Sequence, residues 1–346
     1  MLSGWNRSPV KPQAAENGIF SLYLARTEAN ICASDMPSKD GDISWQLLRR
    51  IVQDWSGTAA ELAEVSPLDG GCISTTLKLE LIDQKQAVLK ISPHRVDRSY
   101  EEESYQLDLM RGLGLPTPHV YAQHTGTLDE PFSYILLQFV SGVDLAVAKR
   151  QCDAPQFERL QDELGRLVAR LHEQTAEAYS RLTPGGCKPF DCWSEFFREV
   201  FDPVWQEAQQ CGLLSVKQRK VVGRLHDRLD QLLDHGDRPR LVHWDIWSSN
   251  VLAEPDSAGE WHVTAILDPC CKFAHAEVEQ AYVDLFKTGT SAFFKAYQQT
   301  HRLPDAYYRV RRPIYQLYFL LNHLQLFGAE YAGRTAAAID GVAALV

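Results

Sequence analysis

The amino-acid sequence predicts a bilobal α+β protein, with a small, mainly antiparallel β N-terminal lobe that carries one key helix and a larger, mainly helical C-terminal lobe. Short apolar runs with strand-like alternation recur through the first half of the chain, and amphipathic helical periodicity dominates from Leu160 onward. A strongly apolar run stops at Ser141-Gly142. We therefore expect an N-terminal lobe over residues 43–140 and a C-terminal lobe over residues 141–346.

Composition and charge narrow the class of protein. The chain has 346 residues, of which 45% are hydrophobic and 23% are charged, values typical of a soluble globular protein. A net charge of -10 argues against a nucleic-acid partner. No apolar run approaches the roughly 20 residues that span a bilayer, so we expect no membrane partner and a cytoplasmic location. The eight cysteines lack the spacings of a disulfide framework or a zinc site, and most are expected to be small buried hydrophobic residues.

The first predicted helix follows a polar N-terminal extension. Residues 1–42 lack sustained periodicity, so we expect a poorly ordered extension, with Met36 as an alternative start to Met1. From Trp45 to Trp55 apolar residues recur at helical spacing, and Gly57 follows them, which predicts an amphipathic helix with a glycine stop.

A glycine-bearing turn separates the first two predicted strands, 61–68 and 75–82. Its backbone amides could approach phosphate oxygens closely, which is the chemistry of a loop that covers a nucleotide. A plain hairpin with glycine for turn geometry is the alternative. The residues expected to bind the nucleotide in this turn are Gly71, Cys72, Ile73 and Ser74.

A lysine interrupts the next apolar strand, 86–92. Lys90 is costly in such a strand unless its ammonium group is paired, and the helix predicted over 100–110 carries carboxylates that could face it. We favour Glu103 as the partner, with Glu102 and Glu101 as alternatives. Such a pair is the one with which kinases hold the phosphates of a nucleotide. The other reading is a lysine that extends to solvent from an edge strand.

Two more strands, 119–124 and 132–140, complete the predicted N-terminal lobe. The second ends where we place the hinge between the lobes. There the backbone groups of Gln138 and Val140 could bind the adenine edge of a nucleotide. The alternative is a buried strand that ends in a turn.

Helical patterns fill most of the second half. The aromatic residues of these helices are expected to lie mostly in the core, because aromatic side chains are usually buried. His172 is expected to be a packing or capping residue. The predicted helices cover 160–171, 191–205, 216–233 and 277–286. Long apolar segments over 292–297 and 314–327 close the chain.

The motif with the candidate catalytic and metal-binding residues lies between these helices. His243, Asp245 and Asn250 follow a short apolar segment, and Asp268 ends the strand predicted over 261–267. With this spacing, Asp245 would accept the proton of an acceptor hydroxyl, and Asn250 and Asp268 would bind Mg²⁺ through oxygen atoms. The alternative is an ordinary strand-loop-strand whose Asp and Asn are turn residues.

The order of these motifs resembles the aminoglycoside-phosphotransferase-like branch of the protein-kinase-like fold, and within it the fructosamine-3-kinase (ketosamine-3-kinase) family. The resemblance runs from about Ser44 to the C-terminus. The residues that carry it are Gly71-Cys-Ile-Ser74, Asp245-Ile-Trp-Ser-Ser-Asn250, Asp268-Pro269 with His275 and Glu277, Phe293-Phe-x-x-Tyr297, Tyr315-Gln-Leu-Tyr318, Leu321-Asn-His323 and Phe327-Gly-x-Glu-Tyr331.

The resemblance implies an ATP- and Mg²⁺-dependent kinase that phosphorylates a hydroxyl group of a sugar joined to an amine. Phosphorylation at the third sugar carbon makes the adduct labile and releases the amine. The resemblance also implies that Trp247 lies beside the sugar, although a wall of the core is the alternative, and that Cys72 is redox-sensitive. His275 and Glu277 are further candidates for the sugar side of the site.

Three residues depart from the family pattern. Trp244, Ser249 and Ala274 stand where the family has glycine. The base and metal positions are kept, so we expect the chemistry to be retained and the preference for substrate to change.

Two rival functions remain open. One is a phosphotransferase for another hydroxyl compound, such as an aminoglycoside or a choline-like alcohol. The other is a catalytically silent nucleotide-binding module. Under the main reading the partner is a small-molecule or protein-linked sugar-amine, and the protein is a monomer or a homodimer.

Overall fold

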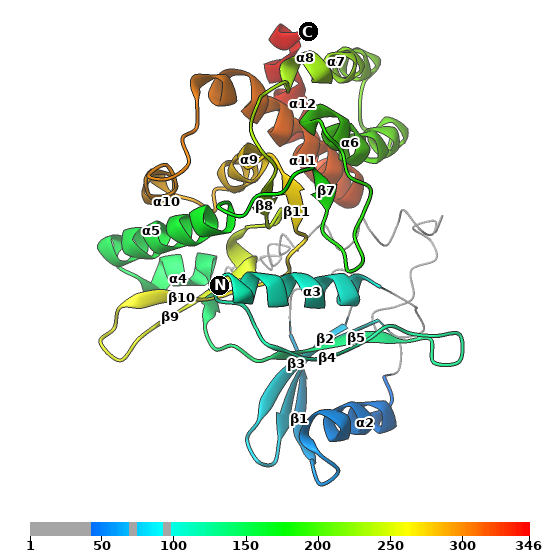
Figure 1. Ribbon diagram of the computed structural model, residues 1–346, viewed down its shortest axis with the longest axis vertical. Coiled ribbons are helices and arrows are strands. Elements are labelled where there is room, and N and C mark those ends of the chain that lie inside the picture. Colours follow the sequence, from blue (N-terminus) through cyan, green and yellow to red (C-terminus); the bar gives the residue numbers. More distant parts are fainter. Residues whose placement is uncertain (1–42, 69–74, 93–97) are drawn as a thin grey trace, which may run out of the picture.

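The structure is a computed structural model that describes residues 43–68, 75–92 and 98–346. The extension predicted over 1–42 and the predicted phosphate loop, Gly71 to Ser74, lie outside the described residues. Figure 1 shows a small sheet with its helices at one end of the molecule and a larger, mainly helical part at the other. The predicted α+β class with a protein-kinase-like fold is confirmed.

The small part is built on a five-stranded antiparallel sheet with the strand order β1-β2-β3-β5-β4. Its strands are β1 (Leu62–Pro67), β2 (Thr75–Leu81), β3 (Gln86–Ser92), β4 (Val120–His124) and β5 (Ser133–Gln138).

The two faces of this sheet are covered by different helices. Helix α2 (Trp45–Ser56) begins where the Ser44 side chain accepts a hydrogen bond from the Leu47 amide, and it packs its apolar stripe on the face that includes Leu136. Helix α3 (Ser99–Gly112) packs on the opposite face, which includes Ile135 and Leu137. Neighbouring residues of a strand point to opposite faces, so the apolar run of β5 serves both cores.

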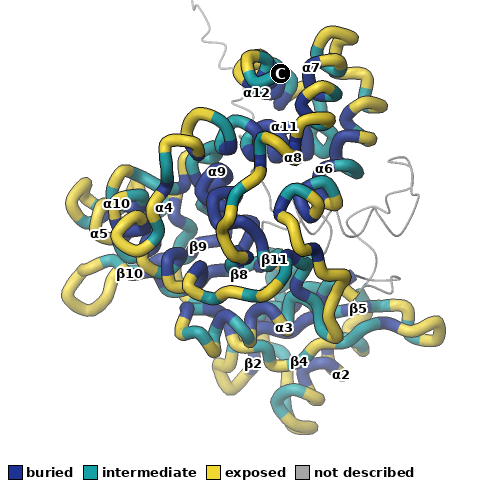
Figure 2. The backbone as a smooth tube through the Cα atoms, turned by 45° about the horizontal axis from the view of Figure 1, so that its top comes forward, coloured by how far each residue is buried: buried dark blue, intermediate teal, exposed yellow. Residues whose placement is uncertain are grey.

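The larger part contains most of the helices, and its buried backbone gathers around α9 and α11 (Figure 2). None of the described helices is long and apolar enough to cross a membrane. The α-helices here are α4 (Leu145–Gln151), α5 (Ala154–Leu171), α6 (Trp193–Gln210), α7 (Val216–Asp227), α8 (Leu229–Leu232), α9 (Glu277–Leu285), α10 (Ser291–Tyr297), α11 (Arg312–Phe327) and α12 (Ala332–Val342). Short 3₁₀ or π segments are η2 (Ser248–Asn250), η3 (Tyr307–Arg311), η4 (Gly328–Tyr331) and η5 (Ala343–Leu345).

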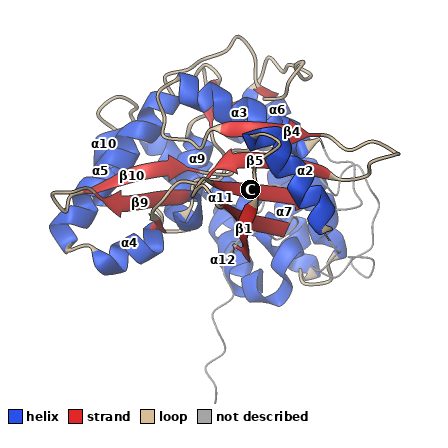
Figure 3. Ribbon diagram, turned by 90° about the horizontal axis from the view of Figure 1, so that it is seen from below, coloured by secondary structure: helices blue, strands red, loops and turns tan. Residues whose placement is uncertain are grey.

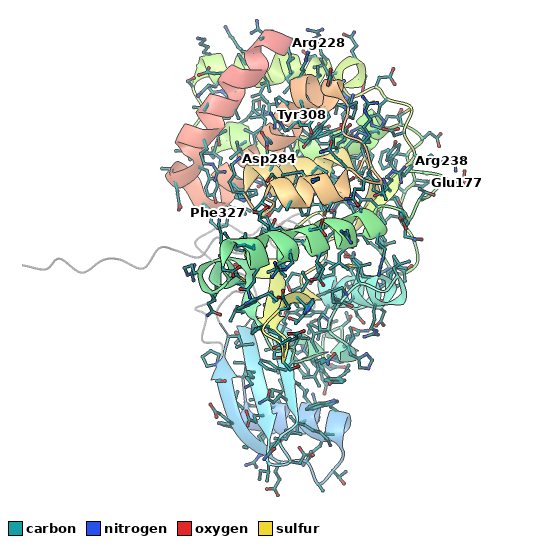
Figure 4. All side chains as sticks on the ribbon, turned by 90° about the vertical axis from the view of Figure 1, so that its left-hand side faces the viewer. Glu177, Arg228, Arg238, Asp284, Tyr308 and Phe327 are labelled. Carbon is teal, nitrogen blue, oxygen red and sulfur yellow. The ribbon has the colours of Figure 1, made fainter. Side chains whose placement is uncertain are left out.

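Polar contacts fix α9 against α11 at the centre of this part. Asp284 on α9 is labelled in Figure 4. Its carboxylate accepts hydrogen bonds from the side chains of Gln316 and Arg312 on α11, at 2.9 and 3.4 Å. The same helix pair is packed through aromatic rings, with the centroids of Tyr282 and Phe319 4.6 Å apart. Helix α9 is therefore a rigid support for whatever its other face contacts.

Two small antiparallel sheets carry the predicted catalytic segments. One has the order β10-β9-β6 and the other the order β7-β11-β8. In Figure 3, β9 and β10 lie beside α5. The strands are β6 (Val143–Asp144), β7 (Ser180–Arg181), β8 (Arg240–Val242), β9 (Val251–Pro255), β10 (Trp261–Ile266) and β11 (Lys272–Ala274).

Helix α3 connects the two parts of the molecule. The buried side chain of Gln106 accepts a hydrogen bond from the Cys271 amide at 2.7 Å and donates one to the carbonyl of Leu182 at 2.8 Å. Near the end of the helix, Met110 is fully buried in the core of the larger part. The helix that carries Glu103 is thus fixed to the part of the molecule that carries Asp245.

Candidate active site

The predicted base, Asp245, lies just after β8, and its side chain is hydrogen bonded on both carboxylate oxygens. The amide nitrogen of Asn250 donates to Oδ2 at 3.1 Å, and the hydroxyl group of Tyr282 donates to Oδ1. Only 2% of Asp245 is exposed. Burial raises the pKa of this carboxyl group to about 7, although the hydrogen bond from Tyr282 works in the opposite direction. A carboxylate with these properties is suited to accept a proton near neutral pH.

Glu279 on α9 holds the backbone of the loop that carries Asp245. Its carboxylate accepts hydrogen bonds from the amides of Trp244 and His243, at 2.6 and 3.3 Å. The imidazole of His172, the C-terminal cap of α5, binds the same carboxylate at 2.7 Å. Glu279 is fully buried, and burial alone would raise its pKa, but His172 and the backbone donors outweigh burial and lower the pKa. The carboxylate is therefore a fixed anchor for the catalytic loop.

Sequence reasoning missed Glu279 and Tyr282. One signal was available for the glutamate, because α9 begins with two closely spaced acidic residues, Glu277 and Glu279, soon after the predicted metal ligand Asp268. For Tyr282 there was no such signal, since a buried tyrosine in an apolar helix usually packs in a core.

Trp244, which stands at a family glycine, adopts a left-handed backbone conformation with φ at 75°. This region disfavours side chains with a Cβ atom and favours glycine, so the loop is strained here. The contacts that offset the strain are the bond to Glu279 and the complete burial of the indole, with the Lys272 ammonium 4.5 Å from its ring centroid. The loop therefore keeps the conformation expected of a glycine while filling the core with an indole.

The predicted metal ligands come together at one end of the β9–β10 hairpin. Val251 pairs with Ile266, and the amide of Leu267 donates to the carbonyl of Asn250 at 2.8 Å, which places Asp268 next to Asn250. The Asn250 amide nitrogen binds Asp245, so the amide oxygen is the atom left for a metal ion. Asp268 has φ at 56°, a conformation that aspartate tolerates. These oxygen atoms fit the hard-ligand preference of Mg²⁺.

Lys90 brings the two parts of the molecule together through charge. Its Nζ atom lies 2.6 Å from Oε1 of Glu103 and 2.5 Å from Oδ1 of Asp268. Burial alone would lower the pKa of Lys90, but the two carboxylates outweigh it and raise the pKa. A permanently charged ammonium group therefore stands between the helix α3 carboxylate and the predicted metal ligand.

Trp247 lies two residues beyond Asp245 and is 6% exposed. Its ring belongs to the core of the larger part, yet its Nε1 atom is buried and has no hydrogen-bond partner among the described residues. Buried indole N–H groups usually have an acceptor, so this unpartnered donor is an exception among the described residues.

The other two sugar-side candidates lie in a separate cluster, at the opposite end of the β8–β11 pair from Asp245. The Glu277 carboxylate binds the guanidinium of Arg311 through two hydrogen bonds, of 2.6 and 2.7 Å. His275 lies 3.1 Å from both the hydroxyl of Tyr315 and the carboxylate of Asp237. The prediction that His275 and Glu277 contact a sugar stays a prediction.

The same cluster contains a group with metal-ligand chemistry. Ligand atoms of His235, Asp237 and His275 lie within 4.8 Å of one another. The two imidazole rings are stacked, with centroids 3.6 Å apart, whereas a metal ion binds an imidazole nitrogen in the plane of its ring. The arrangement therefore favours hydrogen bonding over shared metal ligation.

The predicted adenine-binding residues lie at and beyond the end of β5. The amide of Gln138 donates to the carbonyl of His119 at 2.7 Å, so this N–H group is used within the sheet. Val140 lies in the segment that links β5 to β6, where Gly142 has φ at 132° and a Cβ atom would lie 2.9 Å from the Thr264 hydroxyl. Glycine is required at that bend, and the adenine contacts stay a prediction.

The sequence is similar to known proteins over most of its length. The family model described as fructosamine kinase matches residues 44–344. A protein of Lactiplantibacillus plantarum named "Probable ketoamine kinase" is 28% identical over 280 residues, which cover 78% of this chain and 91% of that protein. The chloroplastic protein-ribulosamine 3-kinase of Arabidopsis thaliana is 25% identical over 309 residues, which cover 84% and 86% of the two chains.

Solved structures share the fold. A Thermobifida fusca protein assigned as a fructosamine-3-kinase has a TM-score of 0.69 and 23% identity, over 88% of this chain and all of that one. The aminoglycoside phosphotransferase APH(4)-Ia, in a ternary complex with AMP-PNP and hygromycin B, has a TM-score of 0.62 and 18% identity, over 85% and 98% of the two chains.

Proposed function

Because this chain belongs to the fructosamine kinase family and is a phosphotransferase that acts on a hydroxyl group of a sugar-amine, we propose that it transfers the γ-phosphate of ATP to a ketosamine. The acceptor would be a fructosamine- or ribulosamine-type adduct, either as a small molecule or linked to a protein. Phosphorylation of the sugar would then make the adduct labile and release the amine.

The proposal rests mainly on the hydrogen bonds around the Asp245 carboxylate. Its carboxylate is held on both oxygens and has a pKa near neutrality. It would accept the proton of the sugar hydroxyl as that oxygen attacks phosphorus. Phosphoryl transfer depends mainly on positioning and on stabilising charge, so a fixed base beside a fixed acceptor is what the reaction needs.

The charged groups opposite the base would hold the nucleotide. Lys90, held by Glu103, would bind the phosphates, and Asn250 with Asp268 would hold Mg²⁺. When bound, the metal ion supplies charge neutralisation to the phosphate oxygens. Asp268 would thus serve both the lysine and the metal site.

Trp247 would form the sugar side of the acceptor site. A flat indole suits the apolar face of a sugar ring, and its unpartnered N–H group would donate to a sugar hydroxyl.

A substrate panel tests this function. The purified protein, with ATP and Mg²⁺, is offered a fructosamine, a ribulosamine, an aminoglycoside and choline, and ATP consumption is measured. We expect turnover on one or both sugar-amines. Turnover on the aminoglycoside or choline alone would contradict the proposed acceptor, and a protein that binds ATP without turnover on any sugar-amine would contradict the proposed reaction.

A further inference from the structure

A lysine and a cysteine are in contact immediately after the predicted metal ligand Asp268. The Nζ atom of Lys272 lies 3.2 Å from the Sγ atom of Cys270 and donates a hydrogen bond to the Cys270 carbonyl at 2.7 Å. Residues i and i+2 of an extended segment project to the same side, which explains why the two side chains meet. No step of the proposed phosphate transfer uses either side chain.

The two partners differ in access. Lys272 is 3% exposed, whereas Cys270 is half-buried, so the cysteine is the more accessible residue of the pair. Burial lowers the pKa of Lys272, so its ammonium group gives up a proton more readily than that of an exposed lysine. Its position beside the sulfur gives the amine a large advantage over external nucleophiles.

We propose that Cys270 and Lys272 form a reversible, oxidation-dependent covalent cross-link. Hydrogen peroxide or a similar peroxide oxidises the thiol to a sulfenic acid, and the peroxide O–O bond breaks with release of water. The Lys272 amine then attacks the sulfur, an S–N bond forms, and the hydroxyl group leaves as a second water with a proton from the amine. The product is a sulfenamide, and a thiol reductant returns both free side chains.

The link would act on the catalytic loop through Trp244. In the reduced protein the Lys272 ammonium lies 4.5 Å from the centroid of the Trp244 indole, next to the strained backbone of the loop. The Cys270 amide also donates to the His243 carbonyl at 3.1 Å. Cross-linking would remove the cation from the indole and restrain the segment that follows Asp268, so we expect a reversible loss of phosphate transfer. This regulatory step rests on the proposed function, whereas the cross-link itself does not.

Peptide mapping tests the cross-link directly. In the reduced chain, trypsin cleaves after Arg240, Lys272 and Lys287, which bound the peptides 241–272 and 273–287. A linked Lys272 is no longer a trypsin site. After treatment of the full-length protein with hydrogen peroxide and digestion without reductant, we expect a single peptide 241–287 that lacks two hydrogen atoms, a loss of about 2 Da. Dithiothreitol should restore cleavage at Lys272.

The neighbouring cysteine provides a matched control. The Sγ atom of Cys271 faces Met110, with 3.8 Å between the sulfurs. Cys271→Ser should keep the link, and Cys270→Ser should abolish it. Normal cleavage at Lys272 in the oxidised protein, with Cys270 found as a disulfide to Cys271 or as a sulfonic acid, would overturn the proposal.

Activity is the second readout. Cys72→Ser is placed in every protein of this assay, because Cys72 is a second thiol that we expect to be redox-sensitive. With ATP and a sugar-amine, peroxide should then lower the rate at least tenfold and reversibly in the proteins that keep Cys270, including Cys271→Ser, and should leave the rate of Cys270→Ser unchanged. If the link forms but the rate stays the same, the cross-link stands and its regulatory role is wrong.

Discussion

Asp245 is the predicted base, and its surroundings shift the pKa of its carboxyl group in opposite directions. Burial favours the protonated carboxyl group, while Tyr282 and Asn250 donate to the charged form. The sequence motif predicts Asp245 as the base. Its partner Tyr282 could not be found in the same way, because it approaches from a helix 37 residues further along the chain.

The raised pKa of Asp245 predicts a pH-dependent stability. The ordinary pKa of this group is 3.8 and the folded value is about 7, so the protonated carboxyl group stabilises the fold fully below pH 3.8, and the contribution is lost as the pH rises to 7. Asp245→Asn stays neutral and should increase the free energy of unfolding at pH 8 by roughly 4 kcal/mol, with little gain at pH 4. Urea unfolding of the metal-free wild type and variant at the two pH values measures the difference in the free energy of unfolding. An equal effect at both pH values would show that burial does not raise the pKa of Asp245.

Tyr282 is predicted to act by positioning the base. Tyr282→Phe removes the donor to Asp245 and should lower kcat about tenfold, or about 1.4 kcal/mol of barrier, with little change in KM for ATP. In an Asp245→Asn background the same change should have no further effect, because the base is already absent. Tyr179→Phe, which loses a hydroxyl bond to the Asp237 carbonyl, is the control and should leave kcat unchanged. A rise in KM for ATP with unchanged kcat would show that Tyr282 acts elsewhere.

Elements with strong periodicity or clear end signals were predictable from the sequence. Strand β3 was expected over 86–92 and lies there, and the glycine stop of α2 has φ at 98° at Gly57. The single helix expected over 216–233 is divided at Arg228 into α7 and α8. Helix α12 was not predicted, because its alanine-rich sequence has no strong apolar stripe and its helical state depends on packing against α11.

Helices α5 and α10 pack so closely that their contact requires a glycine on α5. A Cβ atom at Gly165 of α5 would lie 2.4 Å from the carbonyl oxygen of Phe293, and neither backbone can give way easily. Gly165→Ala should therefore lower the free energy of unfolding by about 1–3 kcal/mol.

Gly223 on α7 is the matched control, since a Cβ atom there would meet nothing within 4 Å. Gly223→Ala should stabilise the protein by about 0.5–1 kcal/mol, because alanine is the better helix former. Denaturant unfolding of the two variants measures both changes. Stabilisation by Gly165→Ala would show that the helices are not packed as closely as described.

At the scale of the whole molecule, the candidate site lies where its two parts meet. Lys90 of the small sheet binds both Glu103 of α3 and Asp268 of the larger part, and Gln106 fixes α3 to β11. The motif order in the sequence predicted this convergence in outline. The buried bridge through Gln106 could not be predicted, since a glutamine within a polar helix carries no sign of its partner.

Nucleotide and metal should stabilise this junction together. A ligand that binds only the folded state raises its stability by mass action. We expect ATP with Mg²⁺ to raise Tm more than ATP with a chelator, and Asp268→Asn to lose the Mg²⁺-dependent part. Asp256→Asn, in the turn of the same β9–β10 hairpin, should behave like the wild type. An unchanged Mg²⁺ effect in Asp268→Asn would remove Asp268 from the metal site.

If Asp245 activates a sugar hydroxyl for phosphate transfer, the product is a phosphorylated sugar-amine, and the identity of that product tests the proposal. A lysine-linked fructosamine is incubated with ATP, Mg²⁺ and either the wild type or Asp245→Asn, and the adduct is analysed by mass spectrometry. We expect a phosphorylated adduct with the wild type and a rate of phosphate transfer lower by several orders of magnitude with Asp245→Asn. Wild-type-like phosphorylation by Asp245→Asn, or no phosphorylated sugar-amine with the wild type, would contradict the proposal.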